Sequence, residues 1–159
     1  MNIPMKVYAV LADPNTEAQI VILKDEQSQA LLPIWVGAYE ASAIRLAMEK
    51  IEIARPLTHE LLKEMLTHLH FRLDKVIIHN VNNNTYYSDL YLEETGTASS
   101  PAKSFQVDAR PSDAIALSLR YDAPLYVAEE ILNHKETTDG LSEWLSRLHP
   151  KGLGSTYNV

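Results

Sequence analysis

Polar side chains crowd one expected strand-to-helix corner of the chain. Asp108 and Arg110 are two residues apart on an extended segment, so both side chains should lie on one face. Ser112 and Asp113 follow at a helix start that Pro111 favours, because the first helical turn needs no amide proton there. Carboxylates can bind Mg²⁺ or Mn²⁺, and an arginine can offset phosphate charge. The same side chains could equally form an internal salt-bridge network that caps the helix.

A second polar cluster lies earlier in the chain, where Thr58 is expected to cap another helix. Arg55, His59 and Glu60 surround that helix start, and helix N-termini present free amide protons that attract anions. An arginine can bind phosphate through two hydrogen bonds, and a histidine can exchange protons near neutral pH. The alternative is a capped helix with surface ion pairs. If both clusters meet in one cleft, an active site is favoured; if they lie on opposite faces, both are structural.

Composition restricts the kind of protein that carries these clusters. The chain has 159 residues and no cysteine, which removes disulfides, thiolate metal sites and cysteine nucleophiles. Its formal charge is −7, from 21 acidic and 14 basic residues, so net charge does not support binding of nucleic acid through a basic surface. There is no signal-peptide pattern, and no apolar run approaches the ~18–20 residues of a membrane span. We therefore expect a cytoplasmic protein without a membrane partner.

Familiar catalytic signatures are missing from the sequence. It contains no Gly-x-Gly-x-x-Gly, no Walker A loop, no His-Glu-x-x-His and no Gly-x-Ser-x-Gly. These absences disfavour a dinucleotide enzyme, a nucleoside triphosphatase, a zincin and an α/β-hydrolase.

Hydrophobic periodicity predicts one α+β domain with a mixed, largely antiparallel sheet packed by helices. The domain is expected to span residues 1–134, and residues 135–159 to form a C-terminal helix with a frayed tail, because Leu141, Trp144, Leu145 and Leu148 recur at helical spacing. Pro33 predicts a sheet edge or a bulge. Strands are expected over residues 5–11, 18–23, 31–36, 73–81, 85–93, 103–109 and 125–127, and helices over 38–50, from 58 onward, over 111–121 and over 129–133.

Four segments, in this order, carry a resemblance to a known family. They are Leu-Pro-Ile-Trp-Val-Gly at 32–37, Glu-Ala at 40–41, Arg-Pro-Leu-Thr-His-Glu at 55–60 and Asp-Ala-Arg-Pro-Ser-Asp-Ala-Ile-Ala-Leu at 108–117. The chain resembles the bifunctional nuclease (BFN) domain family over roughly residues 5–132. The resemblance implies an α+β fold and a nuclease, with DNase and RNase activity attributed to plant members. Glu60 stands where the family pattern would have Asp.

The leading hypothesis from the residues and the resemblance together is a nuclease that hydrolyses phosphodiester bonds of DNA or RNA. His59 would act as base or acid, and Arg55 and Arg110 would stabilise phosphate. The catalytic candidates are His59, Glu60, Asp108, Arg110 and Asp113; the substrate-binding candidates are Glu40, Arg55, Arg110 and Ser112; and the candidate ligands for Mg²⁺ or Mn²⁺ are Glu60, Asp108 and Asp113.

Two other functions stay open from the sequence. One is a non-enzymatic binding or regulatory module, in which the apolar segment 31–36 or the helix around Trp144 contacts a partner or a second copy in a homo-oligomer. The other is an enzyme acting on a small phosphorylated metabolite, for which Arg55 and Arg110 could bind one phosphate without a basic surface.

Overall fold

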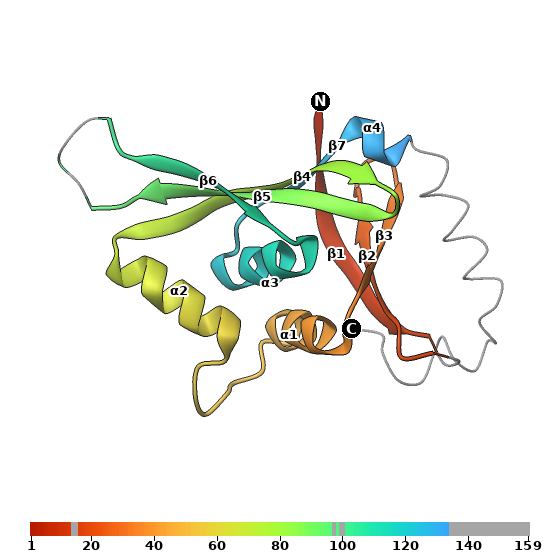
Figure 1. Cartoon of the computed structure of the whole chain (residues 1–159), viewed down its shortest axis with the longest axis horizontal. Coiled ribbons are helices and arrows are strands. Elements are labelled where there is room, and N and C mark those ends of the chain that lie inside the picture. The colour runs from red at the N-terminus through yellow and green to blue at the C-terminus, as the bar shows by residue number, and fades with distance from the viewer. Residues whose placement is uncertain (14–15, 97, 99–100, 134–159) are drawn as a thin grey trace.

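The computed structural model describes residues 1–13, 16–96, 98 and 101–133 (Figure 1). The helix and tail expected over residues 135–159 lie outside the described residues. The strands are β1 (Asn2–Ala12), β2 (Gln19–Lys24), β3 (Leu31–Val36), β4 (Phe71–Asn82), β5 (Thr85–Glu94), β6 (Ser104–Ala109) and β7 (Leu125–Ala128), and the helices are α1 (Ala38–Met48), α2 (Thr58–His68), α3 (Pro111–Tyr121) and α4 (Glu129–Leu132).

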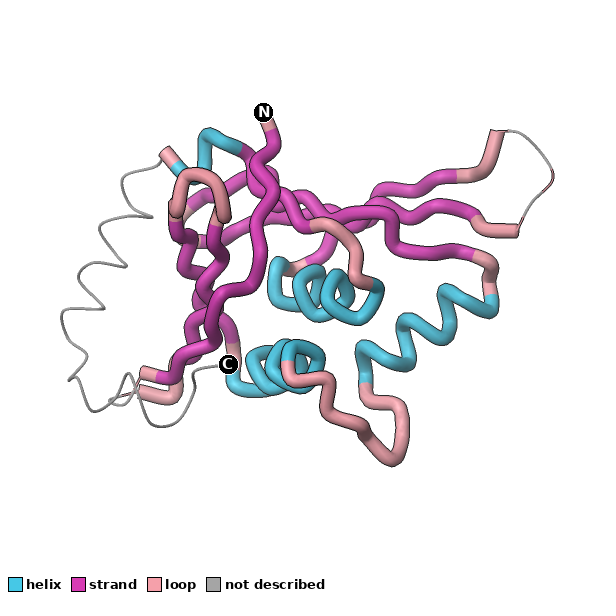
Figure 2. Tube along the Cα trace, turned by 180° about the vertical axis from the view of Figure 1, so that it is seen from behind, coloured by secondary structure: helices cyan, strands magenta, loops and turns pink. Residues whose placement is uncertain are grey.

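The strands form a seven-stranded mixed sheet in the order β3-β2-β1-β7-β4-β5-β6. The β4–β7 pair is parallel, and the other strand pairs of the described chain are antiparallel. Strand β1 joins the two halves, because its beginning pairs with β7 and its remainder with β2. Figures 1 and 2 show β1–β3 running steeply across the direction of β4–β6, which leaves a corner on one side of the sheet.

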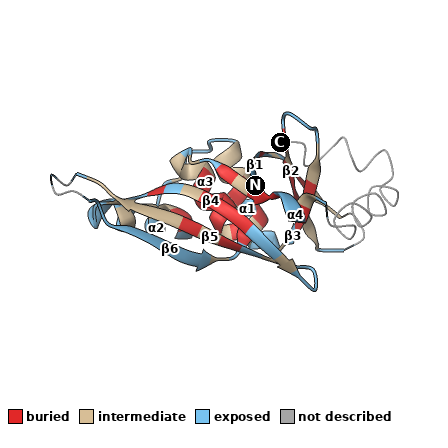
Figure 3. Ribbon diagram, turned by 90° about the horizontal axis from the view of Figure 1, so that it is seen from above, coloured by how far each residue is buried: buried red, intermediate tan, exposed pale blue. Residues whose placement is uncertain are grey.

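Helix α3 fills that corner and is the most buried helix. It contacts α1, α2, β4 and β5, and seven of its side chains from Pro111 to Ser118 are buried. The small residues Ala114 and Ala116 allow close packing, and Ile115 is fully buried. In Figure 3 the buried residues concentrate at the middle of the molecule, whereas α2 and β6 lie at its exposed end. The beginning of α3 is therefore held rigidly from several sides.

The predicted α+β domain with a largely antiparallel sheet is confirmed. The hairpin between β4 and β5 turns through Asn83 and Asn84, whose φ angles of 48° and 61° suit asparagine. Pro33 lies in the edge strand β3, as expected for a residue without an amide proton. The expected N-cap of α2 is wrong by one residue: Leu57 is the N-cap and Thr58 is already helical, without a side-chain cap. No helix in the described part of the chain is long and apolar enough to cross a membrane.

Candidate functional site

Each of the three long helices has a carboxylate as its third residue: Glu40 in α1, Glu60 in α2 and Asp113 in α3. A negative charge in the first turn is stabilised by the free amide protons and by the dipole of the helix. All three carboxylates bind an arginine, and both arginines come from the α3 region of the chain. The site is built from these first turns.

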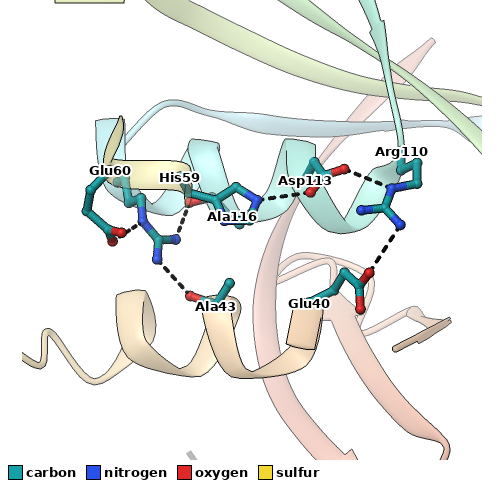
Figure 4. A network of polar contacts seen from close by, with 8 residues as sticks. Glu40, Ala43, His59, Glu60, Arg110, Asp113 and Ala116 are labelled. Carbon is teal, nitrogen blue, oxygen red and sulfur yellow. Dashed lines mark hydrogen bonds and ion pairs between the residues drawn. The ribbon is translucent and has the colours of Figure 1, made fainter. Parts of the chain in front are cut away.

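Arg110 connects the first turns of α3 and α1 (Figure 4). The strand β6 ends at Ala109, and Arg110 becomes the N-cap of α3 with extended backbone angles. Its Nε donates to Asp113 Oδ2 at 2.9 Å, and one terminal nitrogen donates to Glu40 Oε1 at 3.1 Å. The hydrogen bond and the charge of Asp113, followed by those of Glu40, raise the pKa of Arg110. The side chain nevertheless remains 65% exposed, so its guanidinium is accessible to a ligand.

His59 contacts the other oxygen of the same carboxylate. Its Nε2 lies 2.9 Å from Asp113 Oδ1, and the residue is 8% exposed. Burial alone would raise the pKa of Asp113, but hydrogen bonds from Arg110 and His59, together with their charges, lower it below its ordinary value. An ionised carboxylate can only accept, so Nε2 must carry a proton. In neutral His59, Nδ1 then holds the lone pair that can accept a proton.

Gly37 makes room for Glu40 at the start of α1. A Cβ built at Gly37 would lie 2.3 Å from Glu40 Oε2, closer than two atoms can approach without a shift. The carboxylate of Glu40 therefore folds back over the N-terminus of its own helix and still accepts from Arg110. Glycine at this position permits the ion pair between α1 and α3.

Arg120, at the other end of α3, forms a buried clamp that the sequence interpretation missed. Its guanidinium donates to Glu60, to the carbonyl oxygen of Ala116 at 2.9 Å and to that of Ala43 at 3.1 Å, so it ties α1, α2 and α3 together. Its side chain is 6% exposed. Burial alone would raise the pKa of Glu60, but the hydrogen bond and charge of Arg120 lower it. The sequence offered one sign of this role: Arg120 is the only basic residue of α3, and it stands near the end of a largely apolar helix.

The cluster borders two neighbouring clefts. The first has a volume of about 350 Å³ and is lined by residues that include Tyr39, His59, Asp113 and Arg120. The second, of about 280 Å³, is lined by residues that include Trp35. Glu40 and Arg110 line both clefts, so their ion pair is the wall between them. Another cavity, of about 450 Å³, lies beside β1 and holds none of the predicted site residues.

The structure brings together only part of the predicted set. His59, Arg110, Asp113 and Glu40 converge on one cluster, which unites both sequence motifs. Ser112 is buried beside them and lines the second cleft. Within the described chain, Arg55 is exposed and makes no side-chain hydrogen bond or ion pair to the cluster.

Asp108 makes none of the ion pairs or hydrogen bonds that join Glu40, His59, Arg110 and Asp113. It lies on the exposed strand β6 opposite Asp89, whereas Arg110, one residue beyond the strand, pairs with Asp113 and Glu40. Among the described residues, no group of three or more His, Cys, Asp or Glu side chains is placed to hold a metal ion. Glu60 is bound to Arg120 and Asp113 to Arg110 and His59. The three carboxylates predicted as ligands therefore do not form one metal site.

Comparison with known proteins agrees with these motifs. Residues 21–139 match the model of the bifunctional nuclease domain, which is more than half of the chain. The chain belongs to the bifunctional nuclease domain family. The matched range contains every residue of the cluster formed by Glu40, His59, Arg110 and Asp113.

Relatives of this chain occur in bacteria and plants. It is 32% identical to an uncharacterised protein of Mycobacterium tuberculosis over 128 residues, which cover 80% of this chain and 73% of that protein. It is 31% identical to Bifunctional nuclease 1 of Oryza sativa subsp. japonica over 121 residues, 76% of this chain and 36% of the plant protein. The match to Bifunctional nuclease 1 of Arabidopsis thaliana is 30% over 117 residues, 74% of this chain and 35% of that protein. The chain thus spans about a third of the length of these plant relatives.

Proposed function

We propose that this protein hydrolyses phosphodiester bonds of DNA or RNA in the cleft bordered by His59 and Arg110. The observation that carries the proposal is the chain of contacts from His59 through Asp113 to Arg110 at the cleft wall. It joins a group that can exchange protons to an accessible cation that can bind a phosphate. The names of the plant relatives agree with a nuclease.

His59 is suited to act as general base and then as general acid. Asp113 fixes the ring and keeps the proton on Nε2, so Nδ1 accepts a proton from an attacking water. The water oxygen forms a bond to phosphorus, and the bond from phosphorus to the leaving ester oxygen breaks. The proton on Nδ1 then passes to the leaving oxygen, which restores neutral His59. Arg110 stabilises the charge on the non-bridging oxygens.

The charge of the cluster determines how a phosphate enters. Arg110 carries one positive charge and binds two carboxylates, Glu40 and Asp113, so with neutral His59 the group carries one net negative charge. Asp113 also holds His59, whereas Glu40 is bound through a single contact to the exposed Arg110. A phosphate therefore binds by displacing Glu40 from Arg110 while Asp113 stays in place. Glu40 acts as a competitor that sets the affinity for anions.

A divalent metal at Glu60, Asp108 and Asp113 does not fit this arrangement. Two of these carboxylates are hydrogen-bonded to an arginine, and among the described residues no three acidic or histidine side chains are grouped to hold a metal ion. The reaction proposed here has no step through a metal at these residues. Hydrolysis should therefore persist in a chelator, and Mg²⁺ or Mn²⁺ should change the rate mainly through the nucleic acid itself.

Purified protein incubated with labelled DNA and RNA oligonucleotides tests the proposal, with an Asp113→Asn variant purified in parallel. Cleavage should follow the protein through the last chromatographic step and fall by about 100-fold or more in the variant, since the ring loses its anionic partner. Arg72→Ala, which removes an exposed ion pair with Glu93, is the matched control and should retain full activity. Equal cleavage by Asp113→Asn would overturn the proposal, because it would point to a contaminating nuclease or to another site.

A second proposal concerns assembly. We propose that the chain forms homo-oligomers through α2 and the edge strand β6, which leave large apolar side chains exposed. Light scattering of the protein and of a Leu69→Glu variant tests this proposal: the wild type should exceed the mass of one chain, and the variant should shift toward it. A wild-type monomer would overturn the proposal. The exposed side chains are Leu61, Leu62 and Met65 of α2, Leu69 at the C-cap of α2, and Phe105 and Val107 of β6.

A further inference from the structure

Each of the two clefts that share the Glu40–Arg110 wall carries an exposed aromatic ring. Tyr39, which lines the cleft of His59, is 91% exposed, and Trp35, which lines the second cleft, is 46% exposed. Folding normally buries such large apolar surfaces. Two rings that remain in water on either side of an accessible cation are available to stack on planar groups of a ligand.

Both aromatic residues belong to regular structure on either side of Gly37. Trp35 lies in β3, opposite Ile20 of β2, and Tyr39 is the second residue of α1. The rings are therefore placed by the same strand-to-helix connection that places Glu40. This connection places the backbone of both aromatic residues and of Glu40 within regular structure on either side of Gly37.

Charge limits the ligands that these clefts can bind. Among the residues that line the two clefts, the permanent cations are Arg110 and Arg120, and Arg120 is buried in its clamp. The whole chain carries a formal charge of −7. Duplex nucleic acid is bound mainly through many phosphate contacts, which these clefts lack. A nucleic-acid ligand here must obtain its affinity from stacking, and stacking on a protein ring requires an unpaired base.

We propose that the substrate is single-stranded nucleic acid that crosses both clefts. One base stacks on Tyr39, the base on the other side of the wall stacks on Trp35, and the phosphate between them binds Arg110. This inference rests on the proposed function, because it places the phosphate at Arg110, which Asp113 joins to His59. It adds the class of substrate and two residues that position it.

Two measurable properties follow from this arrangement. Base stacking contributes about 1–3 kcal/mol per base, so loss of one ring should weaken binding by about 5- to 140-fold. Because only one phosphate meets an accessible cation, the logarithm of the affinity should fall with the logarithm of salt concentration with a slope of about −0.7. A surface that binds through many phosphates would give a much steeper slope.

The test is binding of a fluorescein-labelled phosphorothioate tetrathymidylate, measured by anisotropy with the full chain. Tyr39→Ala and Trp35→Ala should each weaken binding by about fivefold or more, and Tyr39→Phe and Trp35→Phe, which retain a ring, by less than about twofold. Tyr8→Ala is the matched control, because Tyr8 is also an exposed aromatic residue but lines neither cleft. A blunt duplex should compete at least about tenfold more weakly than a single strand.

The outcomes separate this inference from the proposed function. If the alanine variants bind like wild type, or if the duplex competes equally well, the inference is overturned even where His59-dependent hydrolysis is present. If the oligonucleotide binds through both rings but is never cleaved, the proposed hydrolysis fails and the binding inference stands. In hydrolysis assays the ring variants should raise KM and leave kcat unchanged, which a merely structural role would not produce.

Discussion

The two arginines at the ends of α3 make similar bonds in opposite surroundings. Arg110 binds the first-turn carboxylates of α1 and α3, and its side chain is 65% exposed at the wall of two clefts. Arg120 binds the first-turn carboxylate of α2 and two backbone carbonyls, and its side chain is 6% exposed. The kind of bond is shared, but water can compete for the first arginine and hardly for the second.

This difference in exposure separates an ion pair that stabilises the fold from one that can exchange its partner for a ligand. Removing one partner of a buried ion pair leaves an uncompensated charge, which costs about 3–5 kcal/mol. Exposed pairs contribute about 0–1 kcal/mol, because water replaces either partner. Arg120 therefore stabilises the packing of three helices, whereas Arg110 can exchange a carboxylate for a ligand at little cost in stability.

The largest expected effect is on stability, in Arg120→Leu. The substitution leaves Glu60 and the carbonyls of Ala43 and Ala116 without their donor, so the free energy of unfolding should fall by about 3–5 kcal/mol. Urea denaturation followed by circular dichroism measures this loss. The control Arg72→Leu removes an exposed pair with Glu93 and should cost less than about 1 kcal/mol. Equal losses in the two variants would contradict the comparison.

Arg110→Ala should show the reverse pattern. The free energy of unfolding should change by less than about 1 kcal/mol, because the pairs with Glu40 and Asp113 are accessible to water. The kcat/KM for nucleic-acid cleavage should fall by about 100- to 1,000-fold, since the cation for the phosphate is lost. Urea denaturation and initial cleavage rates, measured for Arg110→Ala and wild type side by side, test both expectations. A variant that unfolds easily yet cleaves normally would reverse the roles assigned to the two arginines.

Asp113 should make stability depend on pH in one direction. The pKa of Asp113 in the folded chain lies below the ordinary value of 3.8. The ionised carboxylate therefore adds to the free energy of unfolding above pH 3.8, and this stabilisation is lost as pH falls through the lowered pKa. Asp113→Asn should lower the free energy of unfolding by about 1 kcal/mol near neutral pH, and this difference from wild type should shrink as pH falls below 3.8. Urea midpoints across this range measure it. If the difference in unfolding free energy between Asp113→Asn and wild type grew on acidification, the pKa of Asp113 would be raised in the folded chain and not lowered.

The smallest expected effect concerns the competitor Glu40. Glu40→Gln removes a negative charge from Arg110, so inorganic phosphate or a short oligonucleotide should bind about two- to fivefold more tightly. Gly37→Ala should act in the same direction, because the new Cβ would displace the Glu40 carboxylate. Isothermal titration with both variants gives the affinities. Weaker binding in Glu40→Gln would mean that Glu40 positions Arg110 for the phosphate and does not compete with it.

The sequence predicted most of the fold because its signals are local. Asn83 and Asn84 marked the hairpin, Pro111 marked the start of α3, and Pro33 marked an edge strand. It also placed His59 and Asp113 in separate motifs that the fold brings within hydrogen-bonding distance. That meeting was left open, because contact between distant segments depends on tertiary packing.

The parts of the site that were not predicted depend on register and burial. Asp108 and Arg110 were expected in one polar cluster, but Asp108 lies on the exposed strand β6 opposite Asp89, whereas Arg110 pairs with Asp113 and Glu40. Arg120 was not singled out, because only packing of α1 and α2 around it turns an ordinary helical arginine into a clamp. Residue type predicted which side chains could bind or transfer protons. Burial in the folded structure then determined that Arg110 is accessible to a ligand and that Arg120 is not.

The central claim is that the cluster of His59, Asp113 and Arg110 carries out phosphodiester hydrolysis. Its most direct test is the initial rate of cleavage of a single-stranded oligonucleotide by His59→Gln, purified in parallel with the wild type and shown by urea denaturation to be folded. We predict a rate about 100-fold or more below that of the wild type, because the variant lacks the ring nitrogen that accepts the proton and returns it. A folded His59→Gln protein that cleaves at the wild-type rate would contradict the account.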